Sequence, residues 1–559
     1  MNRVVVRPLP SLISALLVAA CGGSSTANSP TSDAGSIDSG PRDAGLTERG
    51  LTETGPADTS PTDADGGPMD AAAVDTAVVD ASVQDSPHDA TSDSTSINSH
   101  DAEPIPEAGP CLAASCLTTT ITVEPGTTIG TVPANFVGLS YEKSMMETPF
   151  FRGDNAPLIA MVDLLGPSIL RVGANHVDET VWQTYSGSAN LPFITTAEVD
   201  GLAAFVKAAN WKIIYGVNMK VSSPSVADDE ATYAAKDFGT YLYGFEIGNE
   251  PDLYTTGSVA SSTGTWSLGA FESDWTSFAS AMHMGAPGAP MTGPASAGSY
   301  STWTIPFGKT EASSIALLTQ HYYVANGQDA TSTIDMLLSP GTWQSGLATE
   351  LQALSTAAKA DGIADGYRLS ETNTFYNGGA PNVSDAYGTA LWAIDFLFLN
   401  AQNGCSGVNF HGGGDSTGYT PIADDGAGNV VGARPMYYGM LLFTQAGQGS
   451  MLKTSGGPAS LDFGSYAVAA GAGTTNVVLS NKDATMTVRA TVDVGVTVSD
   501  ASAMGLQGPS LNATTGVTLG GVSIGNDGSF APSWEGVRTS GTTFTVDVPP
   551  DSAVLVTAH

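Results

Sequence analysis

Apolar and polar positions along the chain form two different patterns. The first pattern begins at about residue 118. Short runs rich in Val, Ile, Tyr and Phe are followed by longer stretches whose apolar residues recur at helical spacing. This alternation is typical of βα units that build a parallel sheet. The predicted strands are Phe136–Tyr141, Ser168–Val172, Lys212–Val217, Tyr243–Gly248, Pro290–Gly293, Ala316–Tyr323, Tyr367–Ser370 and Gly407–Phe410.

Helical patterns lie between these strands. Eight strands over about 280 residues fit an α/β fold, the (β/α)8 TIM barrel, whose active sites lie at the C-terminal ends of the strands. The clearest predicted helices are Val199–Ala209, Phe271–Met284, Leu347–Ala360 and Asp385–Leu399.

The second pattern begins after about residue 450, where apolar residues no longer recur at helical spacing. Short alternating strands separated by turn residues predict a C-terminal all-β domain, which we expect to be a sandwich. The earlier segment Thr119–Val123 has the same character and is expected to join its sheet. The predicted strands are Ser465–Ala469, Thr475–Leu479, Thr487–Val494, Thr542–Val548 and Ala553–Thr557.

The N-terminal end is typical of an export signal. Arg3 and Arg7 precede the apolar run Leu12–Ala20, which is too short to span a bilayer as a stable helix. Small residues just before Cys21 are typical of a bacterial lipobox, in which the cysteine is acylated; an ordinary signal peptide is the alternative. By resemblance to bacterial sorting rules, Gly22 indicates an exported lipoprotein of the outer membrane or cell surface, held to the membrane only by this anchor.

Residues 22–110 are rich in Asp, Ser, Thr, Ala, Gly and Pro, with 17 Asp and Glu against two Arg. Because almost nothing apolar can be buried, the segment is expected to be a disordered tail that acts as an extended tether. Calcium binding is an alternative, although the Asp spacing matches no closed calcium loop. The predicted divisions are signal peptide 1–21, tether 22–117, strand 118–132, barrel 133–447 and β-sandwich 448–559.

Composition excludes some classes of partner. The formal net charge is −36 and only 13% of the 559 residues are charged. Nucleic-acid binding requires a basic surface, so the charge argues against a nucleic-acid partner. The acidic balance also disfavours a site for highly sulfated polymers.

The cysteines fit an oxidising compartment. Cys111 and Cys116 are close enough in sequence to form a small disulfide loop, whereas no His–Cys cluster supports a metal site. Cys405 lies in an apolar run and is expected to be a buried, inert thiol.

The fourth predicted barrel strand ends in Asn249-Glu250-Pro251. Pro251 is expected to hold Glu250 extended and to end the strand. At the barrel mouth, a carboxylic acid at Glu250 can protonate a glycosidic oxygen, and Asn249 can bind the 2-hydroxyl of the sugar. A glutamate that only caps a loop is the alternative.

The seventh predicted strand leads into Glu371. In a barrel the fourth and seventh strands lie across the mouth from each other, and retaining glycoside hydrolysis requires two carboxyls about 5–5.5 Å apart. Glu250 as acid/base and Glu371 as nucleophile fit this requirement. For Glu371 alone, a helix N-cap network with Ser370, Thr372 and Asn373 is the alternative.

Three further candidate side chains lie at the ends of predicted barrel strands. Strand alternation places His321 and Tyr323 on one face, where the Tyr323 hydroxyl can donate a hydrogen bond that keeps Glu371 ionised. His411 follows the eighth strand and is a candidate sugar contact. We expect neither a metal nor another cofactor.

Six short motifs accompany the predicted barrel strands. They are Gly138-Leu139-Ser140-Tyr141-Glu142, Leu170-Arg171-Val172-Gly173, Phe245–Pro251, His321-Tyr322-Tyr323, Ser370–Gly379 and Val408–Gly413. Together, over residues 119–559, they resemble glycoside hydrolase family 79, which contains β-glucuronidases and heparanases. The shortage of Lys and Arg near the motifs favours the glucuronidases.

The resemblance implies specific roles. Tyr376 and Tyr419 match tyrosines expected to bind the uronic carboxylate, and Glu142 and Asp178 match acidic residues expected to hold sugar hydroxyls. Ala174 stands where the resemblance leads us to expect glycine. The implied substrate is a glycan that contains glucuronic or 4-O-methylglucuronic acid.

Two alternatives remain open from the sequence. A related glycosidase for a neutral sugar, such as a xylosidase or arabinofuranosidase, would not need the carboxylate pocket of Tyr376 and Tyr419. A catalytically retired, carbohydrate-binding surface lipoprotein would be expected to have lost Glu250 or Glu371, and both are present.

Overall fold

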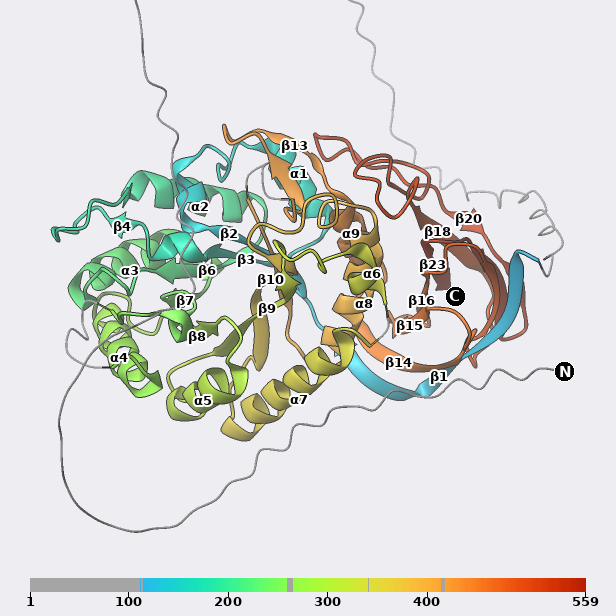
Figure 1. Ribbon diagram of the computed structural model, residues 1–559, viewed down its shortest axis with the longest axis horizontal. Helices are drawn as coiled ribbons and strands as arrows, with labels where there is room; N and C mark the ends of the chain where they lie inside the picture. The colour runs from blue at the N-terminus through green and yellow to red at the C-terminus, as the bar shows by residue number, and fades with distance from the viewer. Residues whose placement is uncertain (1–110, 112–113, 259–264, 340, 414–417) are drawn as a thin grey trace, which may run out of the picture. The chain divides into compact units, whose positions relative to one another are not determined.

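The computed structural model describes residue 111 and residues 114–258, 265–339, 341–413 and 418–559. All of these belong to one compact unit, Asn98–His559. The predicted signal peptide, the predicted acylation site Cys21 and residues 22–110 of the predicted tether lie outside the described residues. The described chain forms a closed parallel barrel joined to a curled β-sheet (Figure 1), which confirms the predicted fold class.

The barrel contains all eight predicted strands. Its order is β10-β11-β2-β3-β6-β7-β8-β9, and neighbouring strands pair in parallel around the closed ring. The strands are β2 (Val137–Glu142), β3 (Ile169–Gly173), β6 (Lys212–Val217), β7 (Leu242–Ile247), β8 (Met291–Ser296), β9 (Leu317–Asn326), β10 (Tyr367–Tyr376) and β11 (Val408–Gly412). The strand pairs β4 (Val181–Trp182) with β5 (Phe193–Ile194) and β12 (Ile422–Asp424) with β13 (Val430–Ala433) lie in loops.

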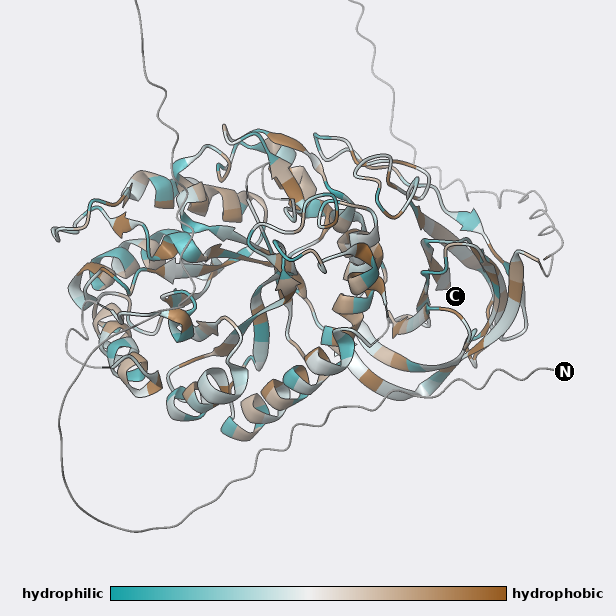
Figure 2. Ribbon diagram, in the orientation of Figure 1, coloured by the Kyte–Doolittle hydropathy of each residue, from teal (hydrophilic) through white to brown (hydrophobic). Residues whose placement is uncertain are grey.

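Several of the helices that surround the barrel begin at recognisable local signals. Thr195 and Glu198 form a capping box at the start of α2, and Ser223 caps α3 just before Pro224. Helix α7 carries hydrophilic and hydrophobic residues together, as an amphipathic outer helix does (Figure 2). The helices are α1 (Ala156–Leu164), α2 (Thr196–Ala208), α3 (Pro224–Phe238), α4 (Leu268–Gly285), α5 (Ile305–Glu311), α6 (Ile334–Leu338), α7 (Gln344–Asp361), α8 (Gly388–Gln402) and α9 (Pro435–Gln445). Among the described residues, none of the helices has the length and apolar character needed to cross a membrane.

The C-terminal region is all-β, as predicted, and its strands belong to one 11-stranded sheet. The sheet curls so that side chains from its two halves, including Val123, Val492, Phe544 and Val556, share one apolar core. The two layers of the expected sandwich are therefore halves of a single sheet. Its strands are β1 (Cys116–Val132), β14 (Gly449–Gly456), β15 (Phe463–Ala469), β16 (Thr475–Asn481), β17 (Thr487–Asp493), β18 (Ala501–Gln507), β19 (Thr518–Leu519), β20 (Glu535–Gly536), β21 (Arg538–Ser540), β22 (Thr543–Val548) and β23 (Ser552–Ala558).

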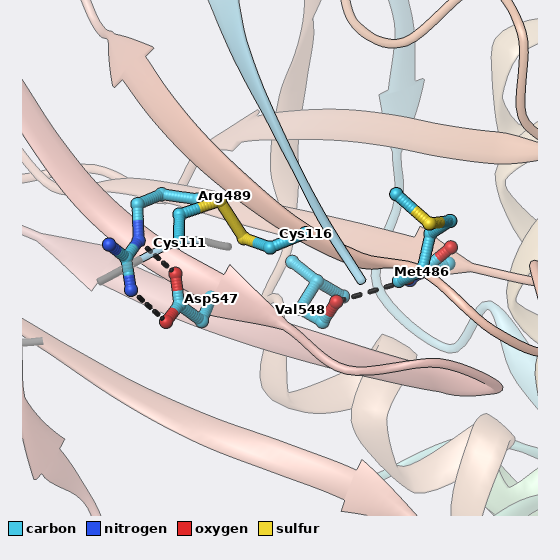
Figure 3. Close-up of a disulfide and its surroundings, with 7 residues drawn as sticks. Cys111, Cys116, Met486, Arg489, Asp547 and Val548 are labelled. Carbon is cyan, nitrogen blue, oxygen red and sulfur yellow. Dashed lines mark hydrogen bonds and ion pairs between the residues drawn. A yellow bond between two sulfur atoms is a disulfide. The ribbon is translucent and has the colours of Figure 1, made fainter. Parts of the chain in front are cut away.

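The first strand of this sheet comes from before the barrel. β1 pairs with β14 in antiparallel and with β17 in parallel orientation, which confirms that Thr119–Val123 joins the C-terminal sheet. The Cys111–Cys116 disulfide closes at the start of β1, near the ion pair of Arg489 and Asp547 (Figure 3). The predicted disulfide is confirmed, and Cys405 is buried as expected.

Helix α8 lies between the barrel and the sheet (Figure 1) and is buried on almost every side. Asp395 of α8 forms an ion pair with Lys482 at 2.6 Å and accepts a hydrogen bond from Tyr466 at 2.8 Å, both from the sheet region. Residues 508–534, which the sequence patterns did not anticipate, also contact the barrel: the N–H of Ile524 donates to the Tyr438 hydroxyl at 3.0 Å. These contacts join the barrel to the C-terminal region on one side.

Candidate active site

The polar centre of the barrel lies above a small apolar floor. Ile169, Ile214 and Leu317 come from three strands and pack together inside the ring. Nearer the C-terminal ends of the strands, the residues that face into the barrel include charged and aromatic side chains. The active sites of such barrels lie at these ends. The structure brings both predicted catalytic glutamates to this position.

Glu371 is buried, with only 6% of its surface exposed. Its Oε1 accepts a hydrogen bond from the Tyr323 hydroxyl at 2.8 Å, and its Oε2 accepts one from Arg171 Nη1 at 2.6 Å. Burial raises the pKa of Glu371, but His411, His321, Arg171 and the Tyr323 hydrogen bond together lower it well below its ordinary value. Glu371 is therefore held as a carboxylate. The hydrogen bond from Tyr323 is the one that the sequence predicted to keep it ionised.

A β-bulge aims Glu371 into the barrel. Leu369 pairs with Gln320, whereas Glu371 pairs with His321, so Ser370 is an extra residue in the strand. Strict alternation from Leu369, which packs in the outer core, would point Glu371 outward as well. The bulge reverses this alternation and turns Glu371 inward. The strand continues to Tyr376, so the expected strand end at Ser370 is wrong, and so is the N-cap alternative.

Glu250 faces Glu371 from the end of β7. Its Oε1 lies 2.9 Å from His321 Nδ1, and its side chain is 19% exposed. The expected extended backbone at Glu250 is wrong, because φ is 47° and ψ is 50°, in the left-handed region. Pro251 disfavours the right-handed helical conformation for the residue before it, and the chain must turn at once into the 3-10 turn Pro251–Leu253. Such strain in a non-glycine residue costs roughly 1–3 kcal/mol and is typical of functional sites.

The spacing of the two glutamates is the central geometric finding. One ligand atom each from Glu250, His321 and Glu371 lies within 4.8 Å of the others. Such a trio can in principle hold a cation. Both oxygens of Glu371 already accept hydrogen bonds, however, and one of the donors is the cationic Arg171. The arrangement therefore suits a preorganised pair of carboxyls better than a metal site.

Arg171 and Glu246 were not predicted as site residues. Arg171, from β3, is fully buried and donates to Glu371, to Glu246 Oε2 at 2.7 Å and to Asn249 Oδ1 at 2.8 Å. Glu246 lies four residues before Glu250 in the same segment. The sequence signal that could have identified both residues is a charged side chain inside an otherwise apolar strand. Ionised side chains are rarely buried without partners.

Other predicted residues surround this pair. Asn249 is buried and its Nδ2 donates to Asn175 Oδ1 at 3.2 Å. Glu142 Oε2 accepts from the N–H of His176 at 2.7 Å, and its Oε1 lies 3.7 Å from His411 Nε2. Burial lowers the pKa of His411, but the carboxylates of Glu371 and Glu142 more than offset this and raise it.

Asp178 is 7% exposed, and the Tyr254 hydroxyl links it to the backbone N–H of Asn249. Asp178 accepts hydrogen bonds from the Tyr254 hydroxyl and from the N–H of Lys220. Burial raises the pKa of Asp178 to about 6, although these donors act in the opposite direction.

The two predicted carboxylate-binding tyrosines both contact Tyr323. The Tyr376 ring lies 6.3 Å and the Tyr419 ring 6.4 Å from the Tyr323 ring, centre to centre. Tyr419 also lies 5.7 Å from the His411 ring and is 8% exposed, whereas Tyr376 is 45% exposed. The structure therefore places both on the side of the site that carries Tyr323, one buried and one facing solvent.

Comparison with solved structures identifies the class of fold. A 4-O-α-L-rhamnosyl-β-D-glucuronidase from Fusarium oxysporum 12S matches with a TM-score of 0.64 at 19% identity, over 79% of this chain and 100% of that one. AbfB, a family 51 α-L-arabinofuranosidase from Bifidobacterium longum, matches with a TM-score of 0.60 at 17% identity, over 79% of this chain and 99% of that one. At these identities the likeness is one of fold.

Comparison of the sequence with those of curated proteins finds two relatives, both named β-glucuronidase. The chain is 26% identical over 321 residues to a β-glucuronidase of Aspergillus niger, which covers 51% of this chain and 58% of the relative. It is 23% identical over 361 residues to a β-glucuronidase of Neurospora crassa, which covers 55% and 63%. The chain thus spans about three fifths of the length of the curated relatives it matches. No family model matches it.

Proposed function

We propose that this protein is a retaining exo-β-glucuronidase of glycoside hydrolase family 79, with Glu371 as nucleophile and Glu250 as acid/base. The observation that carries the proposal is the approach of their carboxyl groups to within 4.8 Å. One oxygen of each group therefore lies nearer to the other than the ~6.5–9.5 Å separation that inverting enzymes need for a water molecule, which favours the closer arrangement of ~5–5.5 Å that retaining enzymes use. The similarity to two proteins named β-glucuronidase supports the choice of sugar.

In the first step, a Glu371 oxygen attacks the anomeric carbon and forms an ester. The bond from that carbon to the leaving oxygen breaks, its electron pair stays with the oxygen, and Glu250 supplies the proton. The hydrogen bond from Tyr323 and the ion pair with Arg171 hold Glu371 ionised and oriented for this attack.

In the second step, water attacks the anomeric carbon while Glu250, now a carboxylate, takes a proton from the water. The ester bond breaks and returns the electron pair to Glu371. His321 Nδ1, 2.9 Å from Glu250 Oε1, can orient the carboxyl in both steps. The anomeric configuration of the sugar is retained because it is inverted twice.

In this proposal, Tyr419 and Tyr376 bind the carboxylate of the uronic acid. A phenolic hydroxyl can donate a charge-assisted hydrogen bond to a carboxylate without an arginine. Asn249, Glu142, Asp178 and His411 surround the glutamates with donors and acceptors suited to sugar hydroxyls.

A second candidate is a neutral-sugar glycosidase, which is favoured by the likeness of the fold to α-L-arabinofuranosidases. A panel of chromogenic substrates separates the two: the β-glucuronide, 4-O-methylglucuronide, β-xyloside and α-arabinofuranoside. Fastest turnover of a glucuronide supports the proposal, and preference for a neutral sugar contradicts it. Binding without any hydrolysis would indicate a carbohydrate-binding protein instead.

The roles of the two glutamates are tested by variants. Glu371→Gln should abolish turnover of every substrate. Glu250→Gln should still form the intermediate from substrates with good leaving groups, which need little protonation, and azide should rescue its breakdown. Failure of azide to rescue Glu250→Gln would contradict the acid/base assignment.

We also propose that the protein is exported and anchored through a lipid on Cys21. The Cys111–Cys116 disulfide supports this, because disulfides persist in oxidising compartments. Metabolic labelling with a fatty-acid analogue should mark the parent protein and leave Cys21→Ala unmarked. Labelling of both would contradict acylation at Cys21.

A further inference from the structure

Glu246 is a fully buried carboxylate behind the catalytic pair. Its exposed fraction is 0%, so no substrate can reach it. Its Oε2 accepts a hydrogen bond from Arg171 Nε at 2.7 Å, and its Oε1 has no hydrogen-bond partner within the described part of the chain. The interaction of Glu246 with the site therefore passes through Arg171.

Arg171 is shared by two carboxylates. Its guanidinium donates to Glu246 from Nε and to Glu371 from Nη1, and no part of the side chain is exposed. Burial lowers the pKa of Arg171, but the two carboxylates raise it overall, so the group stays a cation. In the resting enzyme one buried positive charge thus faces two negative charges.

Esterification of Glu371 changes this balance. When Glu371 bonds to the anomeric carbon, its negative charge disappears and Arg171 loses one of its two counter-charges. A buried charge that loses its partner is costly, because the surroundings cannot solvate it. Glu246 is then the carboxylate that remains in direct contact with Arg171.

We propose that Glu246 is a positioning residue that keeps Arg171 neutralised and in place while Glu371 carries the sugar. The inference rests on the proposed retaining mechanism, which requires a covalent intermediate. Glu246 stabilises that intermediate, and the transition states on either side of it, more than it stabilises the resting enzyme.

The consequence has opposite signs in the two steps. Glu246→Gln keeps an oxygen that can accept from Arg171 Nε but removes the charge. The resting enzyme still pairs Arg171 with Glu371, whereas the intermediate contains an uncompensated cation. Formation of the intermediate becomes slower, and its breakdown becomes faster because that step restores the carboxylate.

The experiment measures the two steps separately in the full chain. A 2-deoxy-2-fluoro-β-glucuronide with a good leaving group slows both steps, so that labelling of Glu371 and later reactivation each have a measurable rate. Glu246→Gln should lower the labelling rate on the order of 10- to 100-fold, the equivalent of one charge-assisted hydrogen bond, and raise the reactivation rate. Glu246→Asp keeps the charge at a greater distance and should change both rates in the same directions by smaller factors.

A matched control separates this role from general support of the fold. Asp395→Asn also removes an ion-paired carboxylate, the partner of Lys482 between barrel and sheet, whose side chain is only 12% exposed, and it should lower Tm without changing either rate. If Glu246→Gln slows both steps, or changes neither, the inference is overturned. If Glu246→Gln fails to fold, the same criterion applies to Glu246→Asp. If the parent protein forms no adduct on Glu371, the proposed function itself fails.

Discussion

Removal of the Tyr254 hydroxyl should change how the stability of the protein depends on pH. This hydroxyl donates to Asp178 Oδ2 at a buried site, where burial already raises the pKa of Asp178 to about 6 from an ordinary 3.8. In Tyr254→Phe the carboxylate loses a donor that favours its charged form, so its pKa should rise further.

The sign of the effect follows from proton binding. Asp178 holds its proton in the folded state at pH values where the unfolded chain has released it. Its contribution to stability is therefore complete below about pH 3.8 and is lost as pH rises through about 6. At ~1.36 kcal/mol for each unit between the two pKa values, the loss is about 3 kcal/mol. A charge-assisted hydrogen bond is worth roughly 1.5–3 kcal/mol, so Tyr254→Phe should increase the loss by about that amount and extend the window roughly one to two pH units higher.

The assay is the free energy of unfolding in urea, measured from pH 4 to pH 9 for the parent, Tyr254→Phe and Asp178→Asn. Subtraction of the Asp178→Asn profile removes the contributions of all other titrating groups. The remaining decrease should end near pH 6 in the parent and at higher pH in Tyr254→Phe. Identical difference profiles, or a window displaced to lower pH, would refute the coupling of Tyr254 to Asp178.

Three further predictions concern specificity, strain and the N-terminal segment. Tyr419→Phe should lower kcat/KM for an aryl glucuronide by about 10- to 100-fold. Tyr376→Phe should lower it less, because Tyr376 is 45% exposed and its hydrogen bond competes with water. Equal losses on the xyloside would mean that the tyrosines only support the structure. Ala174→Gly should raise the free energy of unfolding by about 1 kcal/mol, since Ala174 has φ 54° and ψ −157°, a conformation open mainly to glycine; a lower Tm would contradict this. Deletion of residues 1–110 should leave a folded, active enzyme, and loss of folding would refute the tether interpretation.

Much of the fold could be predicted because period and length are local properties of the sequence. Each barrel strand is a short apolar run, and Thr119–Val123 has the same alternating pattern as the strands of the sheet it joins. Residues 508–534 gave no such signal, because they are mainly loop and are held by contacts with the barrel such as that between Ile524 and Tyr438.

The candidate site could be predicted as a set of residues more readily than as a geometry. The position of Glu250 after one predicted strand and of Glu371 directly after another was enough to pair them. The inward direction of Glu371 depends on an extra residue at Ser370, which becomes visible only when strand partners are known. The shared role of Arg171 likewise depends on contacts between strands far apart in sequence, so spacing alone could not reveal it.

The stereochemistry of the first-formed product tests the central claim most directly. With an aryl β-glucuronide as substrate, proton NMR during the first minutes of hydrolysis follows the anomeric proton before mutarotation mixes the two forms. Double displacement through Glu371, with Glu250 as acid and then base, predicts that the β anomer of glucuronic acid appears first and the α anomer only later. Initial release of the α anomer would contradict the retaining mechanism and the roles assigned to both glutamates.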